Sequence, residues 1–313
     1  MNPPVNSNSH SSYLLLAVDG SEHAYAAAQL VGGLPLPAGC SVHVVAALIP
    51  RYAQQMTILT QVLKQTRLLL SETLDNEIHT QLLTGDPDDE ILTYAEKNRP
   101  NLIVMGARGL RSAFGILLGS VAQRVVEHAP CPVLIARAPF RGLKRVLVAT
   151  DSSESSQFAL RHLTDCPLPK QAEVSVIHVL PPKLTADVYE QSWQFGVELT
   201  APVVTEDMRQ QLEQRAAEER ESGEQLLAET VALLEKQGIV ADGVLRRGDA
   251  ANEILQYARD GKFDLIVAGS RGLGTLRSLL LGSVSRKLVH YADCSVLIVK
   301  PPAPREPIDI LQR

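Results

Sequence analysis

Two segments of this chain have glycines and a serine at the same spacing, and both could bind a ligand. The segments "GARGLRSAFGILLGS" and "GSRGLGTLRSLLLGS" share the pattern G-x2-G-x9-G-S. Closely spaced glycines let a backbone turn tightly and approach a ligand. A Gly-Ser pair opening a helix offers amide N–H groups and a hydroxyl to an anion, which the helix dipole also favours. The pattern therefore predicts two phosphate-binding loops, at Gly106, Gly109, Gly119 and Ser120 and at Gly269, Gly272, Gly282 and Ser283.

Neither loop contains the lysine of a Walker phosphate loop, which ends in Gly-Lys-Ser/Thr. We therefore expect amides and the serine hydroxyl to hold phosphate, with Arg108 or Arg271 supplementing them. The alternative is that the glycines only turn the chain. Two copies with the same nine-residue gap favour the phosphate-binding interpretation.

An acid follows the first apolar run of each copy, at Asp19 and Asp151. A carboxylate there could bind ribose hydroxyls or cap the helix that follows, and the residues alone leave both roles open. The acids Asp88, Asp89 and Glu90 could suggest a metal site, but an acid-rich first helical turn explains them without one.

Other reactive residue types point away from catalysis. The histidines do not recur between the copies, so they are expected to lie in the core or on the surface rather than to perform a duplicated reaction. Cys131 and Cys294 do recur, each at the start of an apolar run, and are predicted to be buried structural thiols.

The elements that position these residues form an internal repeat. Five landmarks recur in the same order, from "YLLLAVDGSE" against "RVLVATDSSE" to "PCPVLIARAP" against "DCSVLIVKPP". Their offset rises from 132 to 163 residues, so the second copy carries 31 extra residues before its Gly-Asp. We expect residues 12–138 and 143–300 to form two domains, after a disordered lead-in at 1–11 and before a tail at 301–313.

Each copy alternates short apolar runs with helical periodicity. The runs 14–18, 42–48, 102–105 and 133–136 are continuous, as in parallel strands covered on both faces. Ser21 and Ser153 are expected to cap the first helices, and Ser120 and Ser283 the last ones. The sequence thus predicts an α/β protein of two tandem, doubly wound, five-stranded parallel-sheet domains, which is a Rossmann-like fold class. Ligands of such sheets bind beyond the carboxyl ends of the strands.

Composition limits the partners. The chain has 313 residues and a net charge of −5, which disfavours nucleic acid and anionic membranes. It has no apolar run of about 18 residues, and its polar start does not read as a signal peptide. Its four cysteines have no metal-binding spacing. We expect a cytoplasmic protein.

Both halves resemble universal stress protein domains. The resemblance is carried by "LAVDGSE" and "LVATDSSE", by "LTGDPDDEI" and "RRGDAANEI", by "IVMGARG" and "IVAGSRG", by the two loops, and by "CPVLI" and "CSVLI". It covers roughly 12–138 and 143–300. It implies ATP binding, with Asp19 and Asp151 at the nucleoside end and the glycine loops around ribose and phosphates. It also implies that backbone near Ala47 and Val179 faces adenine, and that magnesium arrives, if at all, with the nucleotide.

The extra residues of the second copy fall within 181–238. Their first part holds Trp193, the only tryptophan, and is interpreted as a lid or interface element, or else as a surface excursion. Residues 205–238 read as a long amphipathic helix, about 50 Å if unbroken, that bends near Gly223 or protrudes.

We expect a stress-response protein that binds ATP in one or both domains, with regulatory binding rather than fast catalysis. The alternatives are a slow ATPase or nucleotide-dependent transferase, and an interaction module without nucleotide. The two copies are expected to pair through their last strands, at 133–136 and 296–299, and two such chains to form a homodimer.

Overall fold

The computed structural model describes residues 13–110, 117–165, 168–169, 171–183, 205–272 and 281–301. The expected lead-in, nearly all of the expected tail and the segment around Trp193 lie outside these ranges.

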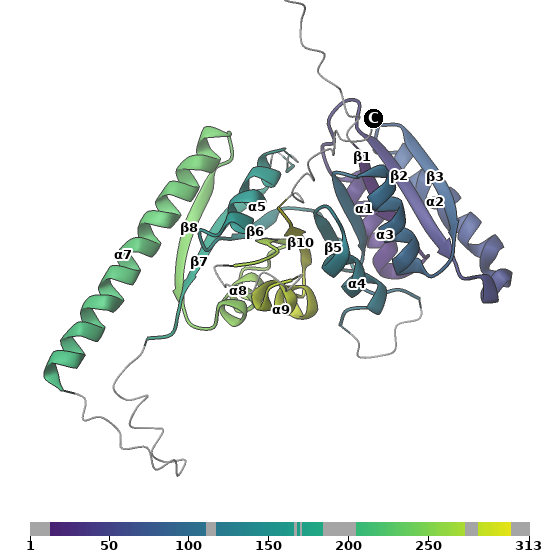
Figure 1. The fold of residues 1–313 in the computed structure, drawn as a ribbon. Helices are drawn as coiled ribbons and strands as arrows, with labels where there is room; N and C mark the ends of the chain where they lie inside the picture. The colour runs from purple at the N-terminus through teal and green to yellow at the C-terminus, as the bar shows by residue number, and fades with distance from the viewer. Residues whose placement is uncertain are drawn as a thin grey trace, which may run out of the picture.

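The two halves repeat the same order of strands and helices (Figure 1). The first half contains β1 (Tyr13–Ala17), α1 (Glu22–Gly32), β2 (Ser41–Leu48), the 3-10 helix η1 (Pro50–Gln55), α2 (Met56–Ser71), β3 (Ile78–Thr84), α3 (Pro87–Asn98), β4 (Leu102–Gly106), α4 (Ser120–His128) and β5 (Val133–Ala136). The second half contains β6 (Arg145–Ala149), α5 (Glu154–Asp165), β7 (Glu173–Leu180), α7 (Glu206–Lys236), β8 (Ala241–Arg247), α8 (Ala250–Asp260), β9 (Leu265–Gly269), α9 (Ser283–Tyr291) and β10 (Ser295–Val299).

All described strands join one ten-stranded sheet in the order β3-β2-β1-β4-β5-β10-β9-β6-β7-β8. Within each half every pairing is parallel, and the order is that of a doubly wound sheet. The halves meet where β5 pairs antiparallel with β10, Leu134 lying opposite Leu297. We call this junction the seam. The predicted fold class and the predicted pairing of the last strands are both confirmed.

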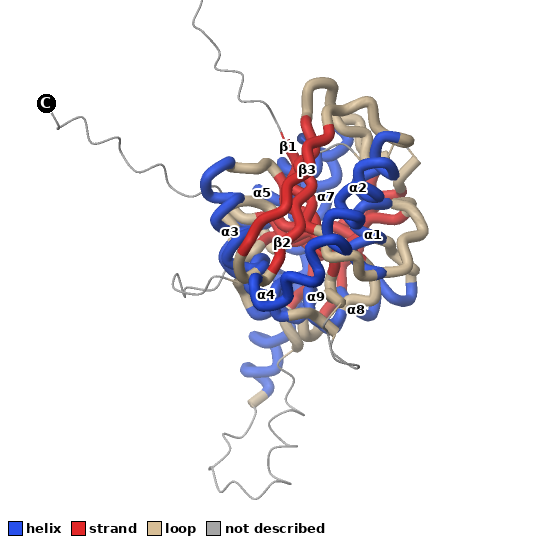
Figure 2. The backbone as a smooth tube through the Cα atoms, turned by 90° about the vertical axis from the view of Figure 1, so that its right-hand side faces the viewer, coloured by secondary structure: helices blue, strands red, loops and turns tan. Residues whose placement is uncertain are grey.

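Helices cover both faces of the sheet (Figure 2). One apolar layer contains buried side chains of α1, α2, α5 and α7, and the other contains those of α3, α4, α8 and α9. Each layer runs across the seam, because side chains from both halves belong to it. The strands are therefore buried on both faces, which explains why they read as continuous apolar runs.

Helix starts follow the sequence signals with one exception. The Ser21 hydroxyl accepts from the N–H of Ala24, and Ser153 does the same for Ser156. The prediction that Ser120 and Ser283 are caps is wrong. The N-caps of α4 and α9 are Gly119 and Gly282, and the serines are the first helical residues. The reason is that the extended backbone of an N-cap is found one residue earlier, at Gly119 with ψ 151° and at Gly282 with ψ 160°.

The long helix α7 matches α2 of the first half. Its buried positions Gly223, Leu227, Thr230 and Leu234 have the same spacing as Leu59, Leu63, Thr66 and Leu70 of α2. By this match residues 206–219 have no counterpart and extend about 20 Å further, at 1.5 Å per residue. Of the two predicted outcomes, the structure shows protrusion: α7 continues through Gly223 and passes beyond the ends of β7 and β8 (Figure 1).

Candidate functional site

A cavity of about 710 Å³ lies at the carboxyl ends of β1, β2 and β4. Its lining includes all of the residues that the sequence predicted for the first half, namely Asp19, Ala47, Gly106, Arg108, Gly109, Gly119 and Ser120. They come from four separate segments of the chain. The sheet therefore brings the predicted residues into one place, where open α/β sheets bind their ligands.

The Asp19 carboxylate joins two of these segments. Its Oδ1 accepts from the N–H of Ser21 at 2.9 Å, and its Oδ2 accepts from the N–H of Leu110 at 2.9 Å. The Ser21 hydroxyl donates to the carbonyl of Arg108 at 3.0 Å. The turn after β1 and the glycine loop after β4 are thus held together before any ligand arrives. Asp19 does not cap the helix itself, because Ser21 does.

The first two glycines are required by close packing inside the protein. A Cβ on Gly106 would lie 2.7 Å from the backbone of His23, and a Cβ on Gly109 would lie 2.6 Å from Oδ2 of Asp19. Real Cβ atoms do not approach other atoms so closely. The spacing G-x2-G therefore lets the loop lie directly against α1 and against the acid.

The far end of the loop presents a helix N-terminus to the cavity. The N–H of Gly119 donates to the carbonyl of Ala107 at 2.8 Å, which closes the loop at its base. Ser120, Val121 and Ala122, the first turn of α4, line the cavity. The first N–H groups of a helix have no partner within it, and the dipole favours an anion there.

Arg108 lies in the cavity lining but is also bound to a side chain that the sequence analysis did not identify. Its Nε donates to Nε2 of His23 at 2.9 Å. Burial lowers the pKa of His23, and the neighbouring Arg108 lowers it further. The second half has Ser155 at this position, so His23 gave no repeat signal.

The opposite wall is mostly apolar, and the sequence analysis missed it. It is formed by Ile49, Gln55 and Leu59 after β2 and by Pro87, Asp88 and Ile91 around the start of α3. An apolar wall facing a few placed polar groups is typical of small-molecule sites. No spacing rule marks such residues, because they meet only through the fold.

The second half repeats the geometry where it is described. Oδ1 of Asp151 accepts from the N–H of Ser153 at 3.0 Å, and the Ser153 hydroxyl donates to the carbonyl of Arg271 at 3.2 Å. A Cβ on Gly272 would lie 2.6 Å from Oδ2 of Asp151. The N–H of Gly282 donates to the carbonyl of Ser270 at 2.8 Å.

The remaining predicted residues of this half lie beside this geometry. Gly269 approaches the backbone of Ser155 as Gly106 approaches that of His23. Val179 lies at the end of β7, and Ser283 opens α9. Residues 273–280 of this loop lie outside the described part of the chain.

The acids near the first site are already paired. Arg124 contacts Asp88 at 2.9 Å and Asp89 at 2.7 Å. Within the described ranges, no three His, Cys, Asp or Glu side chains are grouped as metal ligands. Cys131 is buried and Cys294 is partly so, and burial raises the pKa of both thiols to about 12. Neither thiol is ionised near neutral pH, in line with the predicted structural role.

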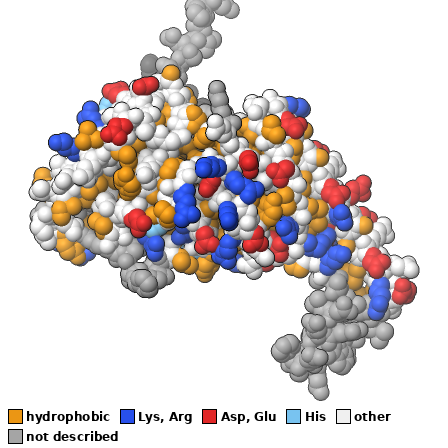
Figure 3. Space-filling model, turned by 180° about the vertical axis from the view of Figure 1, so that it is seen from behind, with side chains coloured by type: hydrophobic (Ala, Val, Ile, Leu, Met, Phe, Trp, Pro, Cys, Tyr) orange, Lys and Arg blue, Asp and Glu red, His pale blue; other side chains and the backbone are white. Residues whose placement is uncertain are grey.

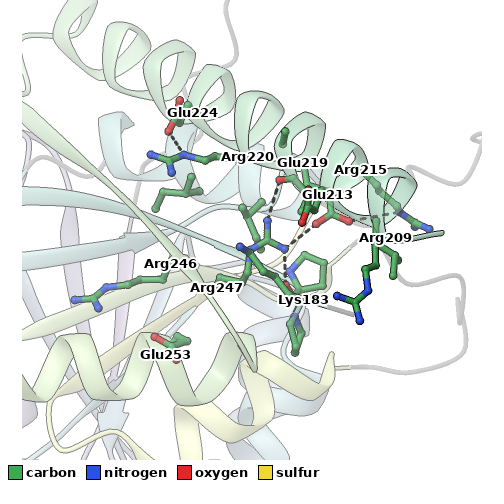
Figure 4. A pocket seen from close by; sticks show the side chains of 17 residues that line it. Lys183, Arg209, Glu213, Arg215, Glu219, Arg220, Glu224, Arg246, Arg247 and Glu253 are labelled. Atoms are coloured by element: carbon green, nitrogen blue, oxygen red, sulfur yellow. Dashed lines mark hydrogen bonds and ion pairs between the residues drawn. The ribbon is translucent and has the colours of Figure 1, made fainter. Parts of the chain in front are cut away.

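A larger groove of about 1290 Å³ lies under the protruding part of α7 (Figure 4). Some of its charged side chains bind one another: Arg247 contacts Glu219 at 2.8 Å, and Arg220 contacts Glu224 at 2.8 Å. Arg247 also donates to the carbonyls of Pro181 and Ala216. These contacts fix α7 at Ala216 and Glu219 to the ends of β7 and β8, which gives this part of the groove a structural role.

The surface gives no sign of a single-charge face on the side seen in Figure 3, where basic and acidic side chains are interspersed. Among the described helices, none combines the length and the apolar character that crossing a bilayer requires.

The universal stress protein family model matches residues 13–137 and 142–300. Because the two segments cover nearly the whole chain, the chain belongs to the universal stress protein family, with two copies of its domain in tandem.

Individual relatives agree with this assignment. Universal stress protein YxiE of Bacillus subtilis is 31% identical over 156 residues, which are 50% of this chain and 98% of that protein. A universal stress protein from Archaeoglobus fulgidus matches the fold with a TM-score of 0.60 and 20% identity, covering 93% of this chain and 98% of the other. Protein PA1789 from Pseudomonas aeruginosa, of unknown function, matches with a TM-score of 0.62 and 16% identity over 95% of each chain. At these identities the two structural matches concern the fold alone.

Proposed function

We propose that this universal stress protein binds an adenine nucleotide, ATP in the first place, at the glycine loop of its first half and at the equivalent loop of its second half. The observation that carries the proposal is the convergence of Asp19, the glycine loop and the start of α4 around one cavity with an apolar wall. The apolar wall suits a flat base, the acid suits ribose hydroxyls, and the helix start suits phosphates.

Regulatory binding fits this site better than rapid turnover. Both carboxylates of the described cavity lining also serve contacts within the protein: Asp19 accepts one N–H group at each oxygen, which leaves lone pairs for ribose hydroxyls, and Asp88 pairs with Arg124. The groups left for phosphate are amides, a hydroxyl and Arg108. Such groups bind a polyphosphate without supplying a general base. Magnesium, where present, would come with the nucleotide.

The test is to identify and count the bound nucleotide. Mass spectrometry of small molecules released from freshly purified, denatured protein should detect an adenine nucleotide, and calorimetry with ATP should give two sites per chain. Gly109→Ala should weaken binding at the first site at least tenfold, because the added Cβ would displace the Asp19 carboxylate.

Gly33→Ala is the matched control. Gly33 has an ordinary negative φ of −91°, and an added Cβ would meet its nearest neighbour at 3.5 Å. This variant should bind ATP like the unchanged protein. A wild-type chain that releases no nucleotide and gives no calorimetric signal with ATP would overturn the proposal.

A further inference from the structure

We propose that Arg137 positions the glycine loop of the first half from the seam, so that nucleotide binding at this loop is coupled to the last turn of α9 in the second half. The inference rests on the proposed nucleotide site and adds a regulatory connection to it.

One guanidinium connects the loop with the other half of the molecule. Arg137 follows β5, and its Nη1 donates to the carbonyl of Leu117 at 2.7 Å. Its Nη2 donates to the carbonyls of Val289 at 2.7 Å and His290 at 3.0 Å, in the last turn of α9. Leu117 lies two residues before Gly119, which caps the helix of the proposed phosphate site. A shift of Leu117 must therefore either break its bond to Arg137 or move Arg137 and strain the bonds of that guanidinium to α9.

The start of the same loop is tied to the same place. Arg108 donates to Nε2 of His23, so the other ring nitrogen carries the hydrogen. The same ring is hydrogen-bonded to the backbone of Ala136, the last residue of β5. The two guanidiniums are close enough that Arg108 lowers the pKa of Arg137, after burial as the larger cause. Both ends of the glycine loop thus depend on the segment that leaves β5 at the seam.

A residue of the second half makes the equivalent contact to a helix of the first half. Lys300 follows β10 as Arg137 follows β5, and its Nζ donates to the carbonyls of Glu127 and Ala129 at 2.9 Å each. These carbonyls end α4, the helix whose first turn lines the proposed site. A cation at a helix C-terminus satisfies carbonyls that lack helical partners and is favoured by the dipole. Each loop helix is therefore capped by the other half.

Arginine matters for the connection, because its planar fork can donate in two directions at once. A lysine ammonium is a compact charge and does not hold two separated groups in a fixed geometry. Arg137→Lys places the residue of the second half at this position. It should keep a positive charge at the end of α9 while losing the fixed link to Leu117.

The experiment uses the full chain with its second site disabled by Gly272→Ala, whose Cβ would displace the Asp151 carboxylate. ATP affinity is then measured by calorimetry with and without Arg137→Lys. The coupling energies usual between linked sites correspond to a loss of about 5-fold to 150-fold in affinity.

Ser295→Ala is the matched control, because the Ser295 hydroxyl accepts from the backbone N–H of Arg137 at 3.2 Å. This variant loosens the seam at the same residue and leaves the guanidinium in place. It should lower the melting temperature but change the ATP affinity less than twofold. An equal loss of affinity in both variants would overturn the positioning role of Arg137.

A second measurement needs no change at the seam. Saturating ATP, added to the chain carrying only Gly272→Ala, should slow amide hydrogen exchange at the end of α9, where the N–H of Ala292 donates to Leu288. ATP binding with unchanged affinity in Arg137→Lys, or with unchanged exchange at α9, overturns this inference alone. A wild-type chain that does not bind ATP overturns the proposed function and this inference with it.

Discussion

At the scale of single residues, the glycine loop is shaped by the protein before it meets a ligand. The Asp19 carboxylate accepts hydrogen bonds from the N–H groups of Ser21 and Leu110. Position 109 is a glycine because a Cβ there would lie 2.6 Å from Oδ2 of that carboxylate. Binding groups that are fixed in this way lose little conformational entropy when they meet a ligand. The same acid and the same close glycine recur at Asp151 and Gly272.

His23 makes the first half sensitive to acid. Burial and Arg108 lower its pKa in the folded protein, while the unfolded chain keeps the ordinary value near 6.5. As the pH falls below that value the unfolded chain takes up a proton first, so this residue lowers the stability of the folded protein. His23→Ser, which supplies the residue of the second half, should therefore lose less stability than the wild type between pH 7 and pH 5.

The measurement is the free energy of unfolding by urea at several pH values for both proteins. At pH 7 the variant is expected to be the less stable one, since it lacks the bond to Arg108, and the difference should narrow on acidification. Parallel curves would show that His23 is not held neutral by its surroundings.

The repeat spacing identified the acids and glycines of the candidate site, which recur in both halves, but it gave no signal for site residues that occur in one half alone. Asp19, Asp151 and the glycines stand out because each appears twice at the same distance from its neighbours. His23 appears once, and the apolar wall of the cavity is assembled from segments whose meeting depends on tertiary packing. Arg137 and Lys300 did carry a signal, since "VLIAR" and "VLIVK" place a cation after the last strand of both copies.

At the scale of elements, the equivalent helices α2 and α7 pack against the same sheet with different side chains. In the first half Leu59 of α2 and Ala46 of β2 are buried in the same apolar layer, while in the second half Gly223 of α7 lies against His178 of β7. A Cβ on Gly223 would lie 2.9 Å from Leu245 and 3.2 Å from His178. The glycine that suggested a bend in the sequence is instead a point where α7 packs closely against the sheet.

Because Gly223 and His178 are in contact, substitutions at these two positions should have non-additive effects on the free energy of unfolding. Gly223→Leu alone should cost about 1–3 kcal/mol through overpacking. His178→Ala alone should also destabilise, because it removes the ring and its hydrogen bond to the carbonyl of Thr150 at 2.8 Å. The double variant, which restores the pairing of the first half, should lose at least about 1 kcal/mol less than the sum of the two. Urea unfolding of the four proteins measures this directly, and additive losses would contradict it.

Element bounds were largely predictable, whereas the extent of α7 was not. Continuous apolar runs mark buried parallel strands, so the run 133–136 corresponds to β5 without a shift. The amphipathic pattern gives the length of α7 but does not show which residues of the sheet contact its N-terminal half. The answer depends on Arg247, which binds the helix from a strand far away in the sequence.

At the scale of the whole molecule, the two halves share one sheet and two apolar layers. The seam contains four residues of β5 that are all buried. Separating the halves would expose this strand, with its apolar side chains and its unpaired backbone groups.

A chain ending at residue 140 should therefore pair with a second copy of itself, β5 against β5 in the antiparallel sense that β10 now provides. Sedimentation equilibrium should give twice the mass of the shortened chain, with circular dichroism showing that it is folded. A folded monomer would contradict this expectation.

The tandem arrangement also limits which surfaces can form larger complexes. Its outermost strands are now β3 and β8, whose rims carry solvated side chains such as His79, Gln81, Asp242 and Arg246. Charged and polar rims discourage further strand addition. Any larger complex, including the expected homodimer of chains, is therefore predicted to assemble through helical surfaces, which keeps the sheet at ten strands.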